Sequence, residues 1–359
     1  MLVREILLAG VMLGGLILYF VLGGADFGGG VWDLLASGPR RDAQRALVSH
    51  AIGPVWEANH VWLIFVVVLL FTAFPRAFAA IGVALHVPLT LFLVGVVFRG
   101  SAFAFQGAML DLRARARHWG RLFAIASLVA PVLLGMCVGA IASGEIRVED
   151  GRVISGFFAP WLRPFSFAVG LFALAECAFL AAAFLAYEAI GGPLELDFRA
   201  RALATGAVVS ALAALALALS ASGATVVFEG LTRGALALTL IAITALAMAG
   251  ALASLWTRRY ALARILAVVQ VSLVLVGWAQ AQAPWLVVPD LTLSNAAAAP
   301  ATQRAVLWTV AAGLPVLGPS LWLLFRIFKP GWPRRTTGSH ARWPLRGSPG
   351  ASDDGLNTR

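Results

Sequence analysis

Charged residues are scarce in this chain of 359 residues. Asp, Glu, Lys and Arg together make up 12% of it, and hydrophobic residues make up 60%. In soluble globular domains charged residues are about a quarter of the total. With a mean hydropathy of +0.88, this composition excludes an ordinary soluble domain.

Cysteine and histidine are also rare, with two and five residues respectively. Cys137 and Cys177 lie inside apolar segments, which excludes a disulfide framework and predicts small core residues. No thiolate pair and no acid-rich cluster accompanies the five histidines, so no metal site is expected. No Ser-His-Asp or Cys-His arrangement is suggested either.

The net charge of +10 raises the question of nucleic-acid binding, but the distribution of charge argues against it. The arginines fall in short loops and in the C-terminal tail, and no basic stripe with interleaved aromatic residues is present. We therefore expect no nucleic-acid partner.

Apolar runs of about 20 residues, long enough to cross a bilayer, recur along the chain. They predict an all-α, polytopic transmembrane protein with about nine helices. The predicted spans are 6–27, 52–73, 77–99, 122–142, 164–187, 202–222, 233–255, 262–282 and 304–327. Arg4 precedes the first run without a small-residue cleavage site after it, which favours a retained helix over a signal peptide.

The chain divides into a helical membrane domain, 1–329, and a basic tail, 330–359. The tail is rich in Gly, Ser, Pro and Arg, a composition that predicts disorder. If the tail is cytoplasmic, about 20 of the 27 Lys and Arg residues lie on the cytoplasmic side, as the positive-inside rule requires. An odd number of spans then puts the N-terminus outside.

The second apolar run opens with the polar segment 53–63, GPVWEANHVWL. In a membrane helix the carboxyl of Glu57, the amide of Asn59 and the imidazole of His60 are costly unless they face a bundle interior or a water path. On a helix the three cannot all share one stripe. The alternative is a polar cap at the membrane boundary, with Trp56 and Trp62 as interfacial anchors.

Two further acids lie in apolar surroundings. Asp26 sits in a glycine-rich stretch, 23–30, at the expected end of the first helix, where it is either a structural cap or a cation or proton site. Glu176 lies near the middle of the fifth predicted helix, where an ionised acid is most costly. A functional role and a structural hydrogen bond are equally compatible with Glu176, and the sequence identifies no partner for it.

A bis-histidine haem needs two imidazoles at the same depth on facing helices. His60 and His86 are offset by roughly 8 Å along the predicted second and third helices, at 1.5 Å per residue. We therefore expect packed, hydrogen-bonded histidines and no haem held by this pair.

Four separated pieces of the sequence form a recognisable set. They are 24–30, GADFGGG; 53–63 with the turn FTAFP at 71–75; 98–105, FRGSAFAF; and PDLT at 289–292 with NAA at 295–297 and a basic end at Phe328-Lys329. Together they resemble subunit II of the cytochrome bd quinol oxidase family. They stand in the family's order and cover nearly the whole chain. The second piece is the most specific of the four.

The resemblance implies a non-haem subunit with two four-helix bundles and a ninth, peripheral helix in the bacterial cytoplasmic membrane. Its expected partner is subunit I, which carries haems b and d and the quinol site. Membrane lipid, quinone and a small single-helix subunit are further expected neighbours. The complex would oxidise quinol and reduce O2 to water with cytoplasmic protons.

Carried over by position, Glu57 matches the family's acid at the cytoplasmic mouth of the proton path, and Asp26 and Arg99 match family positions as well. The sequence departs from the pattern at Ala104, where the family has a second acid, and at Gln106, where it has an arginine. Glu176 has no counterpart in the pattern, although we include it with Glu57 and Asp26 as a candidate proton-path residue.

Two other readings stay open. One is a stand-alone transporter or channel whose route is lined by the three acids, with the glycine-rich stretch as a broken helix. The other is a scaffold that shields the haems of its partner and carries no protons.

Overall fold

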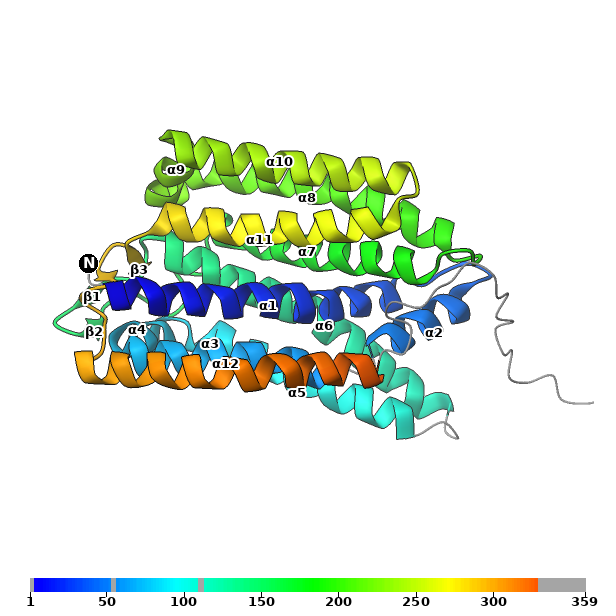
Figure 1. Ribbon diagram of the computed structural model, residues 1–359, viewed down its shortest axis with the longest axis horizontal. Coiled ribbons are helices and arrows are strands. Elements are labelled where there is room, and N and C mark those ends of the chain that lie inside the picture. The colour runs from blue at the N-terminus through cyan, green and yellow to red at the C-terminus, as the bar shows by residue number, and fades with distance from the viewer. Residues whose placement is uncertain (1–2, 53–55, 109–112, 329–359) are drawn as a thin grey trace, which may run out of the picture.

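A computed structural model describes residues 3–52, 56–108 and 113–328 of the chain (Figure 1). The helices are α1 Val3–Leu34, α2 Arg41–Ile52, α3 Trp56–Ala73, α4 Pro75–Ala84, α5 His86–Ala108, α6 Arg113–Ser143, α7 Pro164–Glu188, α8 Glu195–Gly223, α9 Thr225–Thr232, α10 Ala235–Trp256, α11 Tyr260–Gln282 and α12 Pro300–Phe328. The predicted tail, 330–359, lies outside the described residues.

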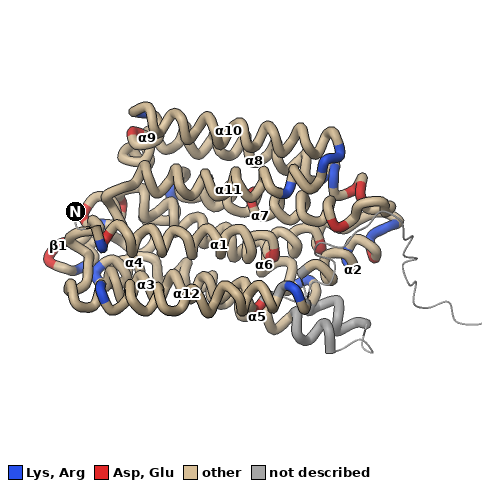
Figure 2. The backbone as a smooth tube through the Cα atoms, viewed as in Figure 1, with Lys and Arg blue, Asp and Glu red and all other residues tan. Residues whose placement is uncertain are grey.

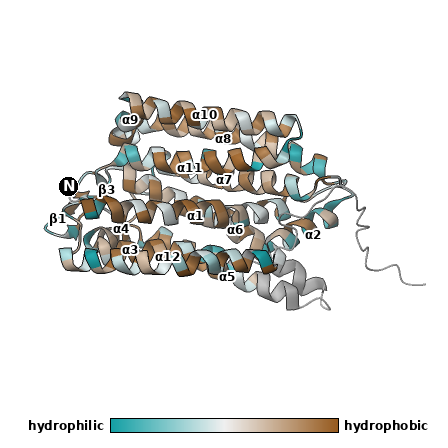
Figure 3. Ribbon diagram, in the orientation of Figure 1, coloured by the Kyte–Doolittle hydropathy of each residue, from teal (hydrophilic) through white to brown (hydrophobic). Residues whose placement is uncertain are grey.

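The described part of the chain is a polytopic helical membrane protein. Seven of its helices are long and apolar enough to cross a bilayer, namely α1, α6, α7, α8, α10, α11 and α12. An eighth span results if α3 and α4, which meet at an angle of 118°, count as one. Apolar residues run along the lengths of the helices, and hydrophilic residues gather at their ends (Figure 3). The expected nine spans would further require α5, whose apolar part, His86–Ala102, is shorter.

The helices form two neighbouring groups (Figure 1). In one group α1 packs against α3 and α6, and α5 packs against α6; in the other α7 packs against α8 and α11, and α10 against α8 and α11. Contacts of α7 with α1 and α6 join the groups, while α12 lies along α1 and α3. α1 and α7 therefore form the centre of the molecule.

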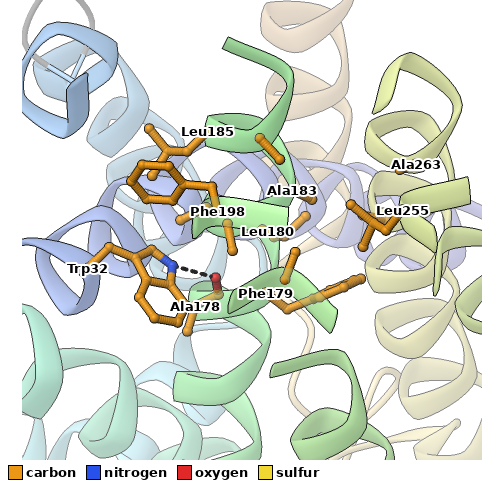
Figure 4. Close-up of a cluster of buried hydrophobic side chains, with 14 of the residues drawn as sticks. Trp32, Ala178, Phe179, Leu180, Ala183, Leu185, Phe198, Leu255 and Ala263 are labelled. Carbon is orange, nitrogen blue, oxygen red and sulfur yellow. Dashed lines mark hydrogen bonds between the residues drawn. The ribbon is translucent and has the colours of Figure 1, made fainter. Parts of the chain in front are cut away.

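A large apolar cluster lies where the two groups meet (Figure 4). Phe179, Leu180 and Phe198 are completely buried in it. The indole Nε1 of Trp32, near the end of α1, donates a hydrogen bond to the carbonyl oxygen of Ala178 on α7, at 2.9 Å. Lipid supplies no hydrophobic driving force between helices. Close packing of small residues such as Ala178 must therefore hold α1 and α7 together.

Several helix boundaries differ from those expected; α6 begins at Arg113 instead of 122, and α8 begins at Glu195 instead of 202. The first helix does not end in the glycine-rich stretch; α1 continues through residues 23–30 to Leu34. The third predicted span, 77–99, is interrupted at Leu85, so that it comprises α4 and the first part of α5. In α1, tertiary packing overrides the low helix propensity of glycine. Pro75 begins α4 at its first helical position.

Several expected loops contain structure of their own. The arginine-containing connection after the first helix forms α2, and a short helix, α9, follows α8. The long polar loop, 144–163, holds a hairpin of β1 Val148–Glu149 and β2 Arg152–Val153. A second antiparallel pair, β3 Trp285–Val287 and β4 Leu291–Thr292, precedes α12.

The charged residues collect at the two ends of the molecule (Figure 2). The N-terminus and the β1–β2 hairpin lie at one end, and α2 lies at the other (Figure 2). At the α2 end Arg40 forms an ion pair with Asp197, and at the hairpin end Arg147 forms one with Asp290, at 3.0 Å. Ion pairs at the ends and an apolar middle are the arrangement that a bilayer requires.

Candidate functional site

A buried guanidinium lies between α1, α3, α5 and α6. Arg99, on α5, is only 1% exposed. Its Nε donates to Ser127 Oγ on α6, at 3.1 Å, and its Nη1 lies 3.2 Å from His60 Nε2 on α3. Ser127 in turn donates to the carbonyl oxygen of Phe123, at 2.7 Å. The arginine thereby ties three helices together inside the apolar part of the molecule.

An aspartate from α1 accompanies this arginine. Asp26 is 5% exposed, and its Oδ2 accepts a hydrogen bond from Asn59 Nδ2 on α3, at 2.7 Å. Asp26 also acts electrostatically on Arg99. A buried charge is tolerated where it is paired and hydrogen-bonded. We call Asp26, Asn59, His60, Arg99 and Ser127 the Asp26–Arg99 cluster.

The glycines of α1 explain how the cluster is assembled. A Cβ on Gly28 would stand 1.9 Å from the carbonyl oxygen of Cys177 on α7, and one on Gly30 would stand 2.2 Å from Ser127 Oγ. Only glycine lets α1 approach α6 and α7 this closely. The glycine-rich stretch is thus a helix-packing surface that brings Asp26 to the middle of the bundle.

Aromatic rings enclose the cluster. The Arg99 guanidinium carbon lies 4.8 Å from the centre of the Phe27 ring and 5.2 Å from that of Phe123. The His60 ring lies 5.6 Å from that of Phe27 and 6.0 Å from that of Tyr19. Within the described chain, Tyr19 Oη, Asn59 Oδ1 and Arg99 Nη2 are buried without a hydrogen-bond partner. Polar atoms of this kind are commonly satisfied by ordered water.

The polar residues at the start of α3 do not all face the same surroundings, as helical spacing predicts. Asn59 points into the cluster with His60, whereas Glu57, two residues earlier, is exposed. Trp62 is 7% exposed and belongs to the same buried cluster as Phe27, which gives no support to the alternative reading of this side chain as an interfacial anchor. The side chain of Trp56, and residues 53–55, lie outside the described part of the structure.

Glu176 lies apart from this cluster, on the side of α7 that faces α11. It is 1% exposed, and its Oε1 accepts a hydrogen bond from Gln270 Nε2, at 2.8 Å. The sequence could not identify this partner, because 94 residues separate the two side chains.

The two intramembrane histidines have separate surroundings. His60 contacts Arg99, Tyr19 and Phe27, whereas His86 Nδ1 lies 2.9 Å from the carbonyl oxygen of Val83 and its ring meets Phe157. The two imidazoles therefore have different neighbours, His60 in the Asp26–Arg99 cluster and His86 outside it. The side chains at the two departures, Ala104 and Gln106, are not among those described.

Sequence reasoning missed Tyr19 and Ser127. Ser127 carries no signal in the sequence, since a serine in an apolar run usually bonds to its own helix. Tyr19 is one of three tyrosines in the chain, and its position inside an apolar run is the single feature that distinguishes it.

Comparison with known families bears on this arrangement. Residues 4–328 match the model of the family described as cytochrome bd terminal oxidase subunit II. The chain belongs to this family. The match includes α1, α3 and α5, the three helices that carry Asp26, Asn59, His60 and Arg99.

Individual relatives agree with the family assignment. The chain is 30% identical over 215 residues to cytochrome bd-I ubiquinol oxidase subunit 2 of Escherichia coli K12, covering 59% of this chain and 54% of the relative. It is 22% identical over 329 residues to a putative cytochrome bd menaquinol oxidase subunit II of Bacillus subtilis, covering 89% and 93%. The first alignment therefore spans about half the length of the relative.

The fold is also that of a solved structure. The chain matches a chain of the bd oxidase from Geobacillus thermodenitrificans with a TM-score of 0.77 and 22% identity. The match covers 91% of this chain and 99% of the other. At this level of identity the likeness shows that the two chains share a fold.

Proposed function

We propose that this chain is the non-haem subunit II of a cytochrome bd-type quinol oxidase in the bacterial cytoplasmic membrane. Its partner, subunit I, would carry haems b and d and oxidise quinol, and the complex would reduce O2 to water. Family membership supports this proposal, as do relatives named as ubiquinol and menaquinol oxidase subunits. The proposed topology has nine spans, an external N-terminus and a cytoplasmic tail.

We further propose that the chain supplies protons from the cytoplasm to the site of oxygen reduction. The observation that carries this is the position of exposed Glu57 two residues before Asn59, which reaches Asp26 in the buried cluster. Glu57 would take up protons at the α2 end, and Asp26 and His60 would accept them deeper in the bundle, with Asn59 holding the Asp26 carboxyl in place. Arg99 would hold the cluster in place and compensate the charge of Asp26.

The path within the cluster would depend on water. Tyr19 Oη, Asn59 Oδ1 and Arg99 Nη2 are the buried polar atoms that water molecules could join into a chain, because each still needs a partner. A hydrated chain of this kind would replace the acid that the family has at the position of Ala104.

Glu57→Gln tests the proton-entry role. Glutamine keeps the size of the side chain but cannot bind and release a proton. In a purified complex with full haem content, oxygen consumption and proton uptake should fall together by about tenfold, which corresponds to about 1.4 kcal/mol on the barrier.

The matched control is Glu149→Gln, which changes an exposed glutamate on the β1–β2 hairpin at the opposite end. Its turnover should equal that of the wild type. Wild-type turnover in Glu57→Gln would instead favour the scaffold reading, in which the chain shields its partner and moves no protons.

The transporter alternative has weaker support. It relied on a broken helix around Asp26, and α1 is continuous there. A pull-down of the tagged chain from its native membrane, followed by a reduced-minus-oxidised spectrum, separates the two readings. We expect b- and d-type haem bands; a colourless protein isolated by a mild procedure would favour the transporter.

A further inference from the structure

A second buried acid lies outside the Asp26–Arg99 cluster. Glu176 on α7 and Gln270 on α11 are 1% and 3% exposed, and the 2.8 Å bond from Gln270 Nε2 to Glu176 Oε1 joins them. Their neighbours along the two helices are apolar: Ala175 and Phe179 on α7, and Val271 on α11, belong to the large cluster between the helix groups. The pair is therefore enclosed in a hydrocarbon-like interior.

If Glu176 were ionised, this pair would have more hydrogen-bond acceptors than donors. Two of its oxygen atoms, Glu176 Oε2 and Gln270 Oε1, are buried with no partner among the described residues. A carboxylate only accepts, and an amide oxygen only accepts. An ionised Glu176 would thus leave two unpaired acceptors and one uncompensated charge in the interior, which is the most costly arrangement available.

Rotation of the Gln270 amide does not remove this excess of acceptors. Turning the Gln270 side chain by half a turn would place its oxygen against the carboxylate and leave its nitrogen without an acceptor there. Among the described residues, Gln270 is the hydrogen-bond partner of the Glu176 carboxyl, and burial in the apolar interior also acts on it. The adjacent Cys177 thiol is one other titratable group within electrostatic reach.

A single proton on the Glu176 carboxyl supplies the missing hydrogen-bond donor. Placed on Glu176 Oε2, it provides the one donor that Gln270 Oε1 lacks, while Gln270 Nε2 continues to donate to Glu176 Oε1. The terminal torsions of Glu and Gln are broad, so the two planar groups can align at little cost. The result is a closed acid–amide pair with two hydrogen bonds in opposite directions.

We infer that Glu176 is a permanent proton-binding site, which holds a proton shared with Gln270 and clamps α7 to α11. Glu176 therefore does not take up and release protons during turnover, although its burial and its position in α7 made it a candidate proton-path residue. This inference does not depend on the proposed oxidase function, since it concerns the protonation state of one side chain in the folded protein.

Infrared spectroscopy of the purified protein, in whatever complex it is isolated, tests the inference directly. Subtracting the spectrum of Glu176→Gln from that of the wild type should show the carbonyl stretch of a protonated carboxylic acid. The band should keep its amplitude from mildly acidic to mildly alkaline pH. A carboxylate band at neutral pH, or a carbonyl band that titrates across this range, would overturn the inference.

A second variant keeps the test informative if Glu176→Gln does not fold. Gln270→Leu removes the acceptor of the shared proton, so the same carbonyl band should move to higher frequency without disappearing. An unshifted band would mean that the proton is not bonded to Gln270.

Stability and turnover give an independent readout. Glutamine at position 176 can form the same two hydrogen bonds with Gln270, so Glu176→Gln should keep the thermal midpoint and turnover of the wild type. Glu176→Leu should lower the thermal midpoint, because it leaves the Gln270 amide buried and unpaired. Loss of turnover in a well-folded Glu176→Gln protein would show that Glu176 exchanges its proton, contrary to the inference.

Discussion

The close approach of α1 to α7 at Gly28 makes a sharp prediction for stability. A Cβ added at Gly28 would lie 1.9 Å from the Cys177 carbonyl oxygen and 2.7 Å from the Ala181 Cβ. Ordinary van der Waals contact begins at 3.4 Å, so the two backbones would have to separate by well over an ångström. The obstacle is helix backbone, which cannot rotate away as a flexible side chain could.

The energetic consequence has two parts. Overpacking in a well-packed interior costs about 1 to 3 kcal/mol. One turn further along α1, the bond from Trp32 Nε1 to Ala178 O, at 2.9 Å, would also be strained, and its loss adds about 1 kcal/mol. Gly28→Ala should therefore lower the free energy of unfolding by about 2 to 4 kcal/mol.

Gly14→Ala is the matched control on the same helix. No atom lies within 4 Å of the Cβ that this change adds, and alanine favours the helix over glycine by about 1 kcal/mol. Thermal unfolding of the purified protein in detergent, followed by tryptophan fluorescence, measures both variants. A Gly28→Ala protein as stable as Gly14→Ala would refute the close α1–α7 contact.

Three further predictions concern charged groups. Arg99→Leu should destabilise the protein by about 3 to 5 kcal/mol, because it removes a buried cation that interacts electrostatically with Asp26 and contacts Ser127 and His60; unchanged thermal unfolding would contradict this role. Asp26→Asn should lower the yield of haem-containing complex more than its turnover per haem, and normal haem content with lost activity would reverse that order. In the loop after α11, burial raises the pKa of Asp290, but the hydrogen bonds from Arg147 and the Val148 amide outweigh it and lower the pKa below its ordinary value. The pKa of Asp290 is therefore lower in the folded state than in the unfolded state. Above the ordinary Asp pKa, the wild type should have a higher thermal midpoint than Asp290→Asn. This difference should vanish as the pH falls through the folded-state pKa.

The local sequence sufficed for the features that depend on hydropathy alone. The apolar runs predicted α7, α10 and α11 to within about two residues, since a span must match the thickness of the bilayer. The four family motifs were sufficient to predict the family to which the chain belongs. Helical spacing likewise predicted that Glu57, Asn59 and His60 would not all share one face, and in the structure Glu57 is exposed whereas Asn59 is buried.

Tertiary structure decided what depends on contacts between distant segments. Glycine is a poor helix former, so the sequence favoured a helix end near Asp26; the contact of Gly28 with the Cys177 carbonyl, 149 positions later in the numbering, explains why α1 continues. The Asp26–Arg99 cluster draws its members from four helices, and no spacing within one helix can predict such a group. The partner of Glu176 is decided in the same way, by the packing of α7 against α11, because a buried carboxyl must find its hydrogen bond wherever the fold places a donor.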